Sequence, residues 1–218
     1  PATALSVVVD NIQDDVSLDG SNGSGATITD LTLTAEGSDS DFALTAAATK
    51  NLDITANAAL DLSGSSLSGT NSLESVTIGG GSSVDLGDIT GGTGDDQLDA
   101  FDASANTGGV TARVDADSNN LGNISEYLFS DGGADNVTLD TNTVDTDVTL
   151  GGGNDAVTLA SSTQTLNAPV DAGAGSADRL IMDSVDAAAA SGNPSSFEAN
   201  ISGFEILETN QVVAAASD

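Results

Sequence analysis

Apolar residues recur along most of this chain at intervals of 20 or 21 residues, and this recurrence constrains the fold more than any other feature. Leu31, Leu52 and Leu73 are each 21 residues apart, and Val137 lies 20 residues before Val157. Each interval holds short stretches of alternating apolar and polar residues, separated by clusters of Gly, Asn, Asp and Ser. Alternation with period two indicates strands, and the clusters indicate turns. The repeat therefore predicts a solenoid of stacked coils.

Further apolar pairs with the same spacing extend this register. We expect the two members of each pair to occupy equivalent inward positions in neighbouring coils, about 4.8 Å apart. These pairs are Leu33 and Ile54, Ile78 and Leu98, Ile89 and Val110, and Leu139 and Leu159. The predicted fold is all-β, a right-handed parallel β-helix or β-roll with about 20 residues per coil. Aromatic residues make up only 3% of the chain, which suits the narrow interior of a solenoid.

The segment 91–99, Gly-Gly-Thr-Gly-Asp-Asp-Gln-Leu-Asp, fits the nonapeptide G-G-x-G-x-D-x-U-x at every fixed position. Glycines allow a tight turn whose carbonyls point inward, and the sixth-position aspartate adds an anionic oxygen. Ca²⁺ takes 6–8 oxygen ligands in irregular geometry, so such a turn suits it. We expect the Asp96 carboxylate and the Gly91 and Thr93 carbonyls to be calcium ligands.

Three weaker copies of the nonapeptide follow the perfect one. They span 130–138, 150–158 and 173–181, and their sixth positions are Asp135, Asp155 and Asp178. The successive steps along the chain from Asp96 to these three aspartates are close to two, one and one coils. We expect stacked turns with Ca²⁺ bound between them. The alternative interpretation is a set of ordinary Gly/Asp loops that bind no metal.

Other acidic residues are weaker candidates for metal ligation. The further predicted ligands are the side chains of Asp95, Asp99 and Asp131 and the carbonyl of Gly151. A separate site could draw on Asp102, Asp115 and Asp117. For Asp14, Asp15, Glu36 and Glu198 the better interpretation is a solvated anionic face.

The charge balance is extreme, with 34 acidic residues against three basic ones and a formal net charge of -31. Because the acids alternate with Val, Leu, Ile and Thr rather than forming blocks, we expect an ordered chain that needs cations. Three scattered cations cannot neutralise phosphates, so nucleic acid is excluded as a partner. The chain has no His and no Cys, which removes the usual zinc ligands and disulfides. No stretch reaches the ~20 apolar residues of a transmembrane helix.

The chain divides into three regions. We expect a leading strand and loop over 1–26, the calcium-binding solenoid over 27–182 and a C-terminal cap over 183–218. Within the solenoid, 115–127 interrupts the repeat and is interpreted as an excursion loop. In the cap, 183–190 predicts a short helix that begins with Asp and precedes Gly192, and 197–207 predicts a closing strand. The chain starts at Pro1 without a leader, which we interpret as a processed form or an excerpt.

Three passages resemble the RTX-type surface-layer proteins of Gram-negative bacteria. They are the nonapeptide at 91–99, the phrase Leu-Asp-Ala-Phe-Asp-Ala-Ser-Ala-Asn-Thr-Gly-Gly-Val at 98–110, and Ile-Ser-Gly-Phe-Glu-Ile-Leu at 201–207. The resemblance covers roughly 30–210. It implies a secreted, calcium-stabilised β-solenoid that assembles into a lattice on the cell surface. The chain departs from the family in having one perfect nonapeptide instead of an uninterrupted tandem run.

Three classes of function compete. The first is a calcium-dependent structural protein of a surface-layer lattice, a homo-oligomer attached to a cell-surface glycan or lipopolysaccharide. The second is an RTX adhesin or matrix module that binds glycans or other cells. The third is an enzyme of the kind found among calcium-dependent parallel β-helices. Such a lyase needs a cationic base, and neither Lys50, Arg113 nor Arg179 lies in an acidic-basic cluster, so we expect no enzyme.

Overall fold

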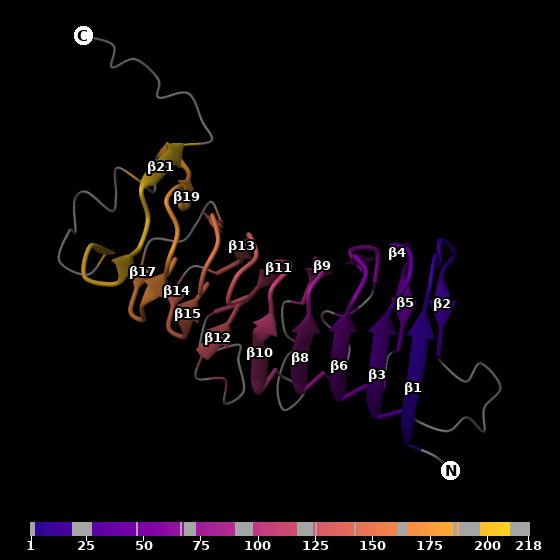
Figure 1. The fold of residues 1–218 in the computed structure, drawn as a ribbon. Coiled ribbons are helices and arrows are strands. Elements are labelled where there is room, and N and C mark those ends of the chain that lie inside the picture. The colour runs from indigo at the N-terminus through magenta and orange to yellow at the C-terminus, as the bar shows by residue number, and fades with distance from the viewer. Residues whose placement is uncertain are drawn as a thin grey trace, which may run out of the picture.

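The computed structural model shows an all-β solenoid in which parallel strands stack in coils of about 24 residues (Figure 1). Strands of successive coils lie side by side along the solenoid, which runs from β1 near the N-terminus to β21 near the C-terminus. The structure describes residues 3–18, 28–46, 48–65, 67, 73–89, 98–116, 124, 126–141, 143–160, 165–184, 187 and 197–209. The predicted parallel β-solenoid is confirmed, with coils slightly longer than the predicted repeat.

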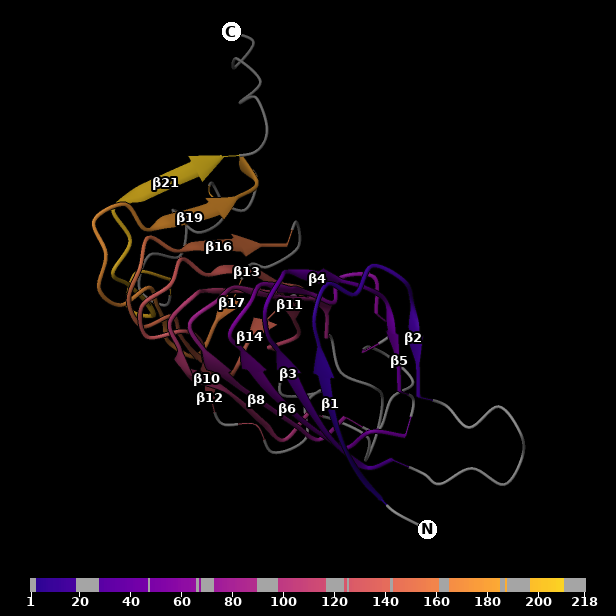
Figure 2. The ribbon, with the colours of Figure 1, turned by 45° about the vertical axis from the view of Figure 1, so that its right-hand side comes forward.

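A nine-stranded parallel sheet forms one wall of the solenoid, as Figure 2 shows from a second side. In spatial order its strands are β1 (Ala4–Val9), β3 (Asp30–Ala35), β6 (Asn51–Ala56), β8 (Ser75–Gly80), β10 (Ala100–Asn106), β12 (Glu126–Leu128), β15 (Asp147–Thr149), β18 (Val170–Asp171) and β20 (Ile201–Ser202). The strands shorten from six or seven residues in β1–β10 to two or three in β12–β20.

An eight-stranded parallel sheet forms a second wall. In spatial order its strands are β4 (Ser40–Asp41), β7 (Leu60–Asp61), β9 (Val84–Asp88), β11 (Val110–Val114), β13 (Asn136–Leu139), β16 (Ala156–Leu159), β19 (Arg179–Met182) and β21 (Ile206–Thr209). Two short pairs add to the third side. They join β2 (Val16–Ser17) to β5 (Leu44–Thr45), and β14 (Thr143–Val144) to β17 (Thr165–Leu166).

The strand register confirms some of the predicted apolar pairs and corrects others. Confirmed neighbours are Leu31 with Leu52, Leu33 with Ile54, Val137 with Val157, and Leu139 with Leu159. The next partner of Leu52 is Val76 and not Leu73, because the coil between β6 and β8 is longer than the predicted repeat. For the same reason Val110 pairs with Val84 and not with Ile89, and Ile78 pairs with Ile54 while Leu98 lies before β10.

Inward side chains from both sheets form one continuous apolar core along the solenoid. Most of it is Leu, Ile, Val and Ala, as the composition predicts. One aromatic cluster interrupts this pattern, where β10 pairs with β12. Phe101 lies 5.6 Å from Tyr127 and 4.9 Å from Phe129, measured between ring centroids. The Tyr127 hydroxyl donates to the Asp115 carbonyl at 2.8 Å, which satisfies its buried polar end.

The regions at the two ends continue the coil pattern. β1 pairs with β3 along its whole length, so the predicted leading strand belongs to the nine-stranded sheet. The predicted closing strand over 197–207 is two short strands, β20 and β21, which lie in different sheets. Of the predicted helix over 183–190 the structure describes three residues, and there the Ala187 N–H donates to the Asp183 carbonyl at 2.9 Å. None of the described residues forms a helix long and apolar enough to cross a membrane.

Candidate cation-binding corner

The turns that lead from the nine-stranded to the eight-stranded sheet stack on one another and align one residue from each coil. We call this alignment the corner column. Its members are Ser40, Leu60, Val84, Val110, Asp135, Asp155, Asp178 and Glu205. The column is mainly apolar in the N-terminal coils and becomes entirely acidic after Val110. Three of the four predicted sixth-position aspartates, Asp135, Asp155 and Asp178, therefore share one corner in consecutive coils.

Each acidic member of the column accepts a hydrogen bond from the backbone N–H of the column residue one coil earlier. The distances are 2.6 Å from Val110 N to Asp135 Oδ1, 2.8 Å from Asp135 N to Asp155 Oδ1, 2.7 Å from Asp155 N to Asp178 Oδ1, and 2.9 Å from Asp178 N to Glu205 Oε2. Hydrogen bonds that end on ionised carboxylates are stronger than neutral ones. The carboxylates thus connect neighbouring coils at the corner, just before the strands β13, β16 and β19 begin.

The aspartates of the column are buried, at 2% exposure for Asp135 and 0% for Asp155 and Asp178. Asp135 has a second set of partners, because its Oδ2 accepts from both the N–H and the hydroxyl of Ser130 at 3.0 Å. Oδ2 of Asp155 and Oδ2 of Asp178 are the two buried side-chain polar atoms of the described residues that have no hydrogen-bond partner. A buried carboxylate oxygen without a partner is costly, and a bound cation would remove that cost.

Burial raises the pKa of Asp135 to about 7, against the opposing hydrogen bonds from Val110 and Ser130. Burial also raises the pKa of Asp155 to about 6, and the negative charge of Asp178 adds to the shift, while the Asp135 N–H lowers it. The ionised forms of both carboxylates are therefore disfavoured in the metal-free protein. A cation would favour the ionised forms.

Two glycines beside the aspartates have no side chain, and the space that this leaves is lined by carboxylate and carbonyl oxygens. A Cβ built on Gly175 would lie 2.4 Å from Asp178 Oδ2, 2.4 Å from the Gly153 carbonyl oxygen and 2.5 Å from Asp178 Oδ1. A Cβ on Gly153 would lie 2.2 Å from the Gly133 carbonyl oxygen and 2.9 Å from Asp155 Oδ1. Oxygens of consecutive turns thus converge where only glycine fits. A carboxylate with peptide carbonyls is a donor set that Ca²⁺ takes.

The turn in the coil before Asp135 is closed without a carboxylate. Asn106 is 0% exposed, and its Nδ2 donates to the Ser82 carbonyl at 3.0 Å. Its Oδ1 accepts from the N–H groups of Gly108 and Gly109, both at 2.9 Å. Every polar atom of this amide is partnered, so this turn is complete without an ion.

The structure separates the remaining predicted ligands. Gly91, Thr93, Asp95 and Asp96 lie outside the described residues, in the stretch between β9 and β10. That stretch leads from the eight-stranded sheet back to the nine-stranded one. The corner column lies instead on the connections that lead from the nine-stranded sheet to the eight-stranded one. Asp99 and Asp131 are exposed, and the Gly151 carbonyl accepts from the Ala174 N–H at 2.7 Å.

The separate site considered at 102–117 does not come together in the described part of the chain. Asp102 lies exposed on β10 of the nine-stranded sheet, where its Oδ1 accepts from the Ser104 N–H and hydroxyl. Asp115 follows β11 of the eight-stranded sheet, and Asp117 lies outside the described residues.

Glu205 is a column member that the nonapeptide pattern did not identify. Its turn, Gly203-Phe204-Glu205, is shorter than the turns before Asp155 and Asp178 and does not match the pattern. The longer glutamate side chain still reaches the N–H of Asp178. Leu207, two residues after Glu205, is the signal that could have indicated this position, because an apolar residue lies at the same distance after each motif aspartate.

Within the ranges that the structure describes, no three acidic side chains gather as a metal site built from carboxylates alone would require. The corner offers one carboxylate per coil with peptide carbonyls between, which is a different kind of donor set. Comparison with protein-family models, with curated proteins and with solved structures finds no match for this chain.

Proposed function

We propose that this chain is a secreted structural protein that folds with Ca²⁺ and assembles into a lattice on the cell surface. Calcium would bridge adjacent coils at the corner column and join subunits through their acidic surfaces. The observation that carries the proposal is the pair of buried, unpartnered oxygens, Oδ2 of Asp155 and Oδ2 of Asp178, the second of which lies beside the Gly153 carbonyl. The resemblance to RTX-type surface-layer proteins supplies the lattice role.

Electrostatics supports the need for a cation. Strands in neighbouring coils lie about 4.8 Å apart, and two unit charges at that distance repel by about 3 kcal/mol at an effective dielectric of 20. A divalent ion between coils converts this repulsion into attraction. Because the unfolded chain holds no preformed site, the binding free energy would contribute directly to folding.

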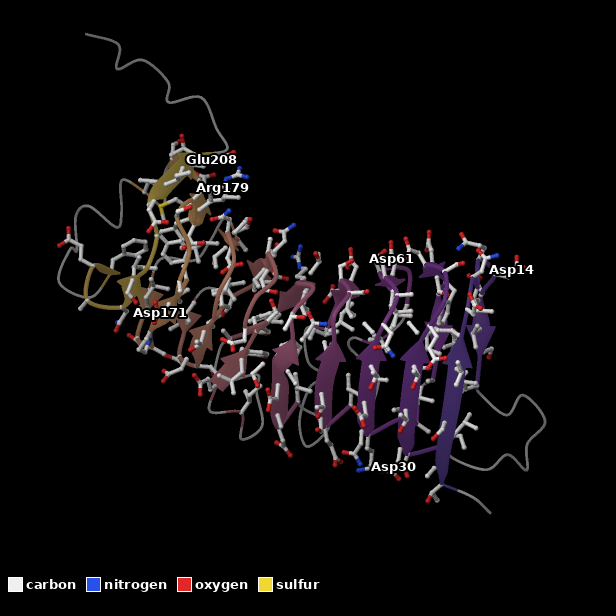
Figure 3. The ribbon with its side chains drawn as sticks, in the orientation of Figure 1. Asp14, Asp30, Asp61, Asp171, Arg179 and Glu208 are labelled. Carbon is white, nitrogen blue, oxygen red and sulfur yellow. The ribbon has the colours of Figure 1, made fainter. Side chains whose placement is uncertain are left out.

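The outer surface supports bridging between subunits. The acids Asp14, Asp30, Asp61 and Asp171 lie along the outside of the solenoid (Figure 3). Asp41, Asp61 and Asp85 stand next to one another on β4, β7 and β9 and line a groove of about 430 Å³. Such rows carry no counter-charge of their own, since the basic side chains Lys50, Arg113 and Arg179 pair with Glu74, Asp140 and Glu208.

An adhesin that binds glycans is the second candidate, and the aromatic side chains favour the lattice over it. Sugar-binding sites use exposed aromatic faces, whereas Phe42, Phe101, Tyr127 and Phe129 are buried, and Phe197 and Phe204 are half-buried against the core. The outermost strands instead expose aliphatic residues, Val8 at 65% and Leu207 at 61%. Edge strands with exposed aliphatic residues favour contacts with further polypeptide.

The test is titration of the metal-stripped protein with Ca²⁺, followed by calorimetry, circular dichroism and electron microscopy of the same samples. We expect calcium binding, a gain of β-structure and then ordered sheets. A folded monomer that gains no order would favour the adhesin. A chain that is fully folded and binds no calcium would contradict both candidates.

A further inference from the structure

Among the described residues, the solenoid buries acidic side chains in its later coils and not in its earlier ones. We call β3–β9 (30–88) the N-terminal segment and β12–β19 (126–182) the C-terminal segment. The buried acids of the described residues are Asp135, Asp155, Asp178 and Asp183, all of which follow the N-terminal segment. In the N-terminal segment the buried polar side chains are Ser40 and Thr49, among the residues described. Both are neutral and partnered, with Ile12 N–H and the Ile28 carbonyl respectively.

Strand length in the nine-stranded sheet changes at the same place. This sheet has six-residue strands at β3, β6 and β8, but three-residue strands at β12 and β15 and a two-residue strand at β18. In the eight-stranded sheet β4 and β7 have two residues, β9 has five, and β13, β16 and β19 have four. The C-terminal segment therefore has less pairing in the nine-stranded sheet, in the same coils that bury carboxylates.

Together these observations distinguish an N-terminal segment whose described buried polar side chains are partnered from a C-terminal segment with unpartnered carboxylate oxygens. The N-terminal coils place apolar residues, Leu60 and Val84, in the corner column. The C-terminal coils place Asp135, Asp155 and Asp178 there, with two carboxylate oxygens left unpartnered. Among the described residues such oxygens lie in the C-terminal segment alone, where they destabilise the metal-free state.

We infer that the calcium requirement for folding is confined to the C-terminal segment, and that the N-terminal segment folds without the ion and serves as the template on which the calcium-dependent coils form. This inference rests on the proposed calcium-dependent function and specifies which part of the chain the ion controls. In the lattice-forming protein the N-terminal coils would then stay folded with or without calcium, and the C-terminal coils would fold only when the ion binds.

The junction between the segments offers groups on which the next coil can form. Asn106 closes the corner of the β10 coil with a neutral amide, so this corner of the last coil before Asp135 is complete without metal. Its neighbour Val110 donates its N–H to Asp135 Oδ1, the first carboxylate of the column. Phe101, Tyr127 and Phe129 pack across the same boundary. The edge of the metal-free part thus presents both the hydrogen-bond donor and the apolar surface for the next coil.

Hydrogen exchange read by mass spectrometry on the whole chain tests this division. The protein would be compared with Ca²⁺ at about 100 times Kd, with chelator, and with Mg²⁺ at equal concentration as a control for charge screening. We expect chelation to lower amide protection in β13, β16 and β19 by about a hundredfold, the factor that linkage gives at this concentration. Protection in β3, β6 and β8 should stay within about twofold. Mg²⁺, which demands an octahedral shell, should not restore the C-terminal protection.

Two results would overturn the inference while the proposed function stands. One is equal loss of protection in both segments on chelation, and the other is retained protection in both although calcium binds in calorimetry. If calorimetry detects no calcium binding and exchange does not respond to chelator, the proposed function itself fails. The two failures are therefore distinguishable in a single set of samples.

Discussion

Asp155 Oδ1 accepts a hydrogen bond from the backbone N–H of Asp135, one coil earlier, at 2.8 Å. Its other oxygen, Oδ2, is buried without a partner. One carboxylate thus has two separable tasks, because Oδ1 joins coils whether or not metal is present and Oδ2 is left for a cation. Asparagine keeps the first task and removes the charge, whereas alanine removes both.

The first prediction concerns these two substitutions. Asp155→Ala should destabilise the calcium-loaded protein by about 1–3 kcal/mol through the unpaired Asp135 N–H alone. Asp155→Asn keeps an acceptor at Oδ1, so in chelator at pH 8 it should be at least as stable as the unsubstituted protein, because it carries no buried charge beside Asp178. Denaturant unfolding with and without Ca²⁺ measures both effects.

Asp147→Asn is the matched control, since it makes the same charge change on the exposed face of the same coil. It should leave both the chelator and the calcium stability within about 0.5 kcal/mol of the original. If Asp155→Asn and Asp147→Asn respond equally to calcium, Asp155 is not a ligand.

The second prediction concerns pH in the metal-free protein. The pKa of Asp135 is about 7 and that of Asp155 about 6, both raised by burial above the ordinary value of 3.8. Between these values and 3.8 the folded state holds more protons than the unfolded state. Stability in chelator should therefore fall as pH rises from about 4 to about 7, by up to about 1.4 kcal/mol per pH unit for each group.

Calcium should reverse this trend, because it binds the ionised carboxylates and its affinity rises as they lose their protons. The measurement is thermal unfolding by circular dichroism at pH 5 and pH 8, in chelator and in Ca²⁺. Calcium should raise Tm more at pH 8 than at pH 5. If calcium raises Tm by the same amount at pH 5 and at pH 8, these two carboxylates are excluded as ligands.

The sequence predicts the solenoid well, because period-two alternation and turn clusters are local signals that every coil repeats. It also places Asp135, Asp155 and Asp178 in consecutive coils, since the separations of 20 and 23 residues equal single coils there. Inward ladders such as Leu33 with Ile54 follow from the same spacing. These successes share one condition, a coil length that stays near the assumed period.

The predictions failed where the coil length changed. Val84 pairs with Val110, so the coil that contains 91–99 is longer than the assumed repeat. The step from Asp96 to Asp135 is then more than one coil and less than two. Asp96 falls between β9 and β10, on a connection from the eight-stranded to the nine-stranded sheet, whereas the corner column lies on connections in the other direction. The turn before Asp178 also has one more residue than the turn before Asp155, since Ala174 bridges to Gly152. Such insertions leave no periodic trace in the sequence.

The third prediction concerns the space beside Gly175. Gly175→Ala would place a methyl carbon 2.4 Å from Asp178 Oδ2 and from the Gly153 carbonyl oxygen. The turn must shift or the carboxylate must turn away, so we expect a loss of about 1–3 kcal/mol. The calcium affinity should weaken as well. Calorimetry with Ca²⁺ and denaturant unfolding measure the two effects.

Gly132→Ala is the control for that substitution. It lies in the turn before Asp135, where the nearest atom to an added Cβ is the Thr107 Cβ at 3.7 Å, an ordinary contact. It should change neither the calcium affinity nor the stability appreciably. Equal effects of the two alanines would mean that glycine is needed for backbone freedom in these turns and not for space around the oxygens.

The fourth prediction concerns the aromatic junction between the segments. Phe129 is 2% exposed and packs against Phe101 in the preceding coil, so Phe129→Ala should cost about 3–5 kcal/mol through the cavity it leaves. Because the junction carries the template for the C-terminal coils, the loss should fall on that segment. Hydrogen exchange in Ca²⁺ should show lower protection in β13 and β16 and unchanged protection in β3 and β6.

Tyr127→Phe keeps the ring and removes only the bond to the Asp115 carbonyl, so it should cost about 1 kcal/mol and leave this pattern intact. Loss of protection at β3 and β6 in Phe129→Ala would show instead that the solenoid unfolds as one unit.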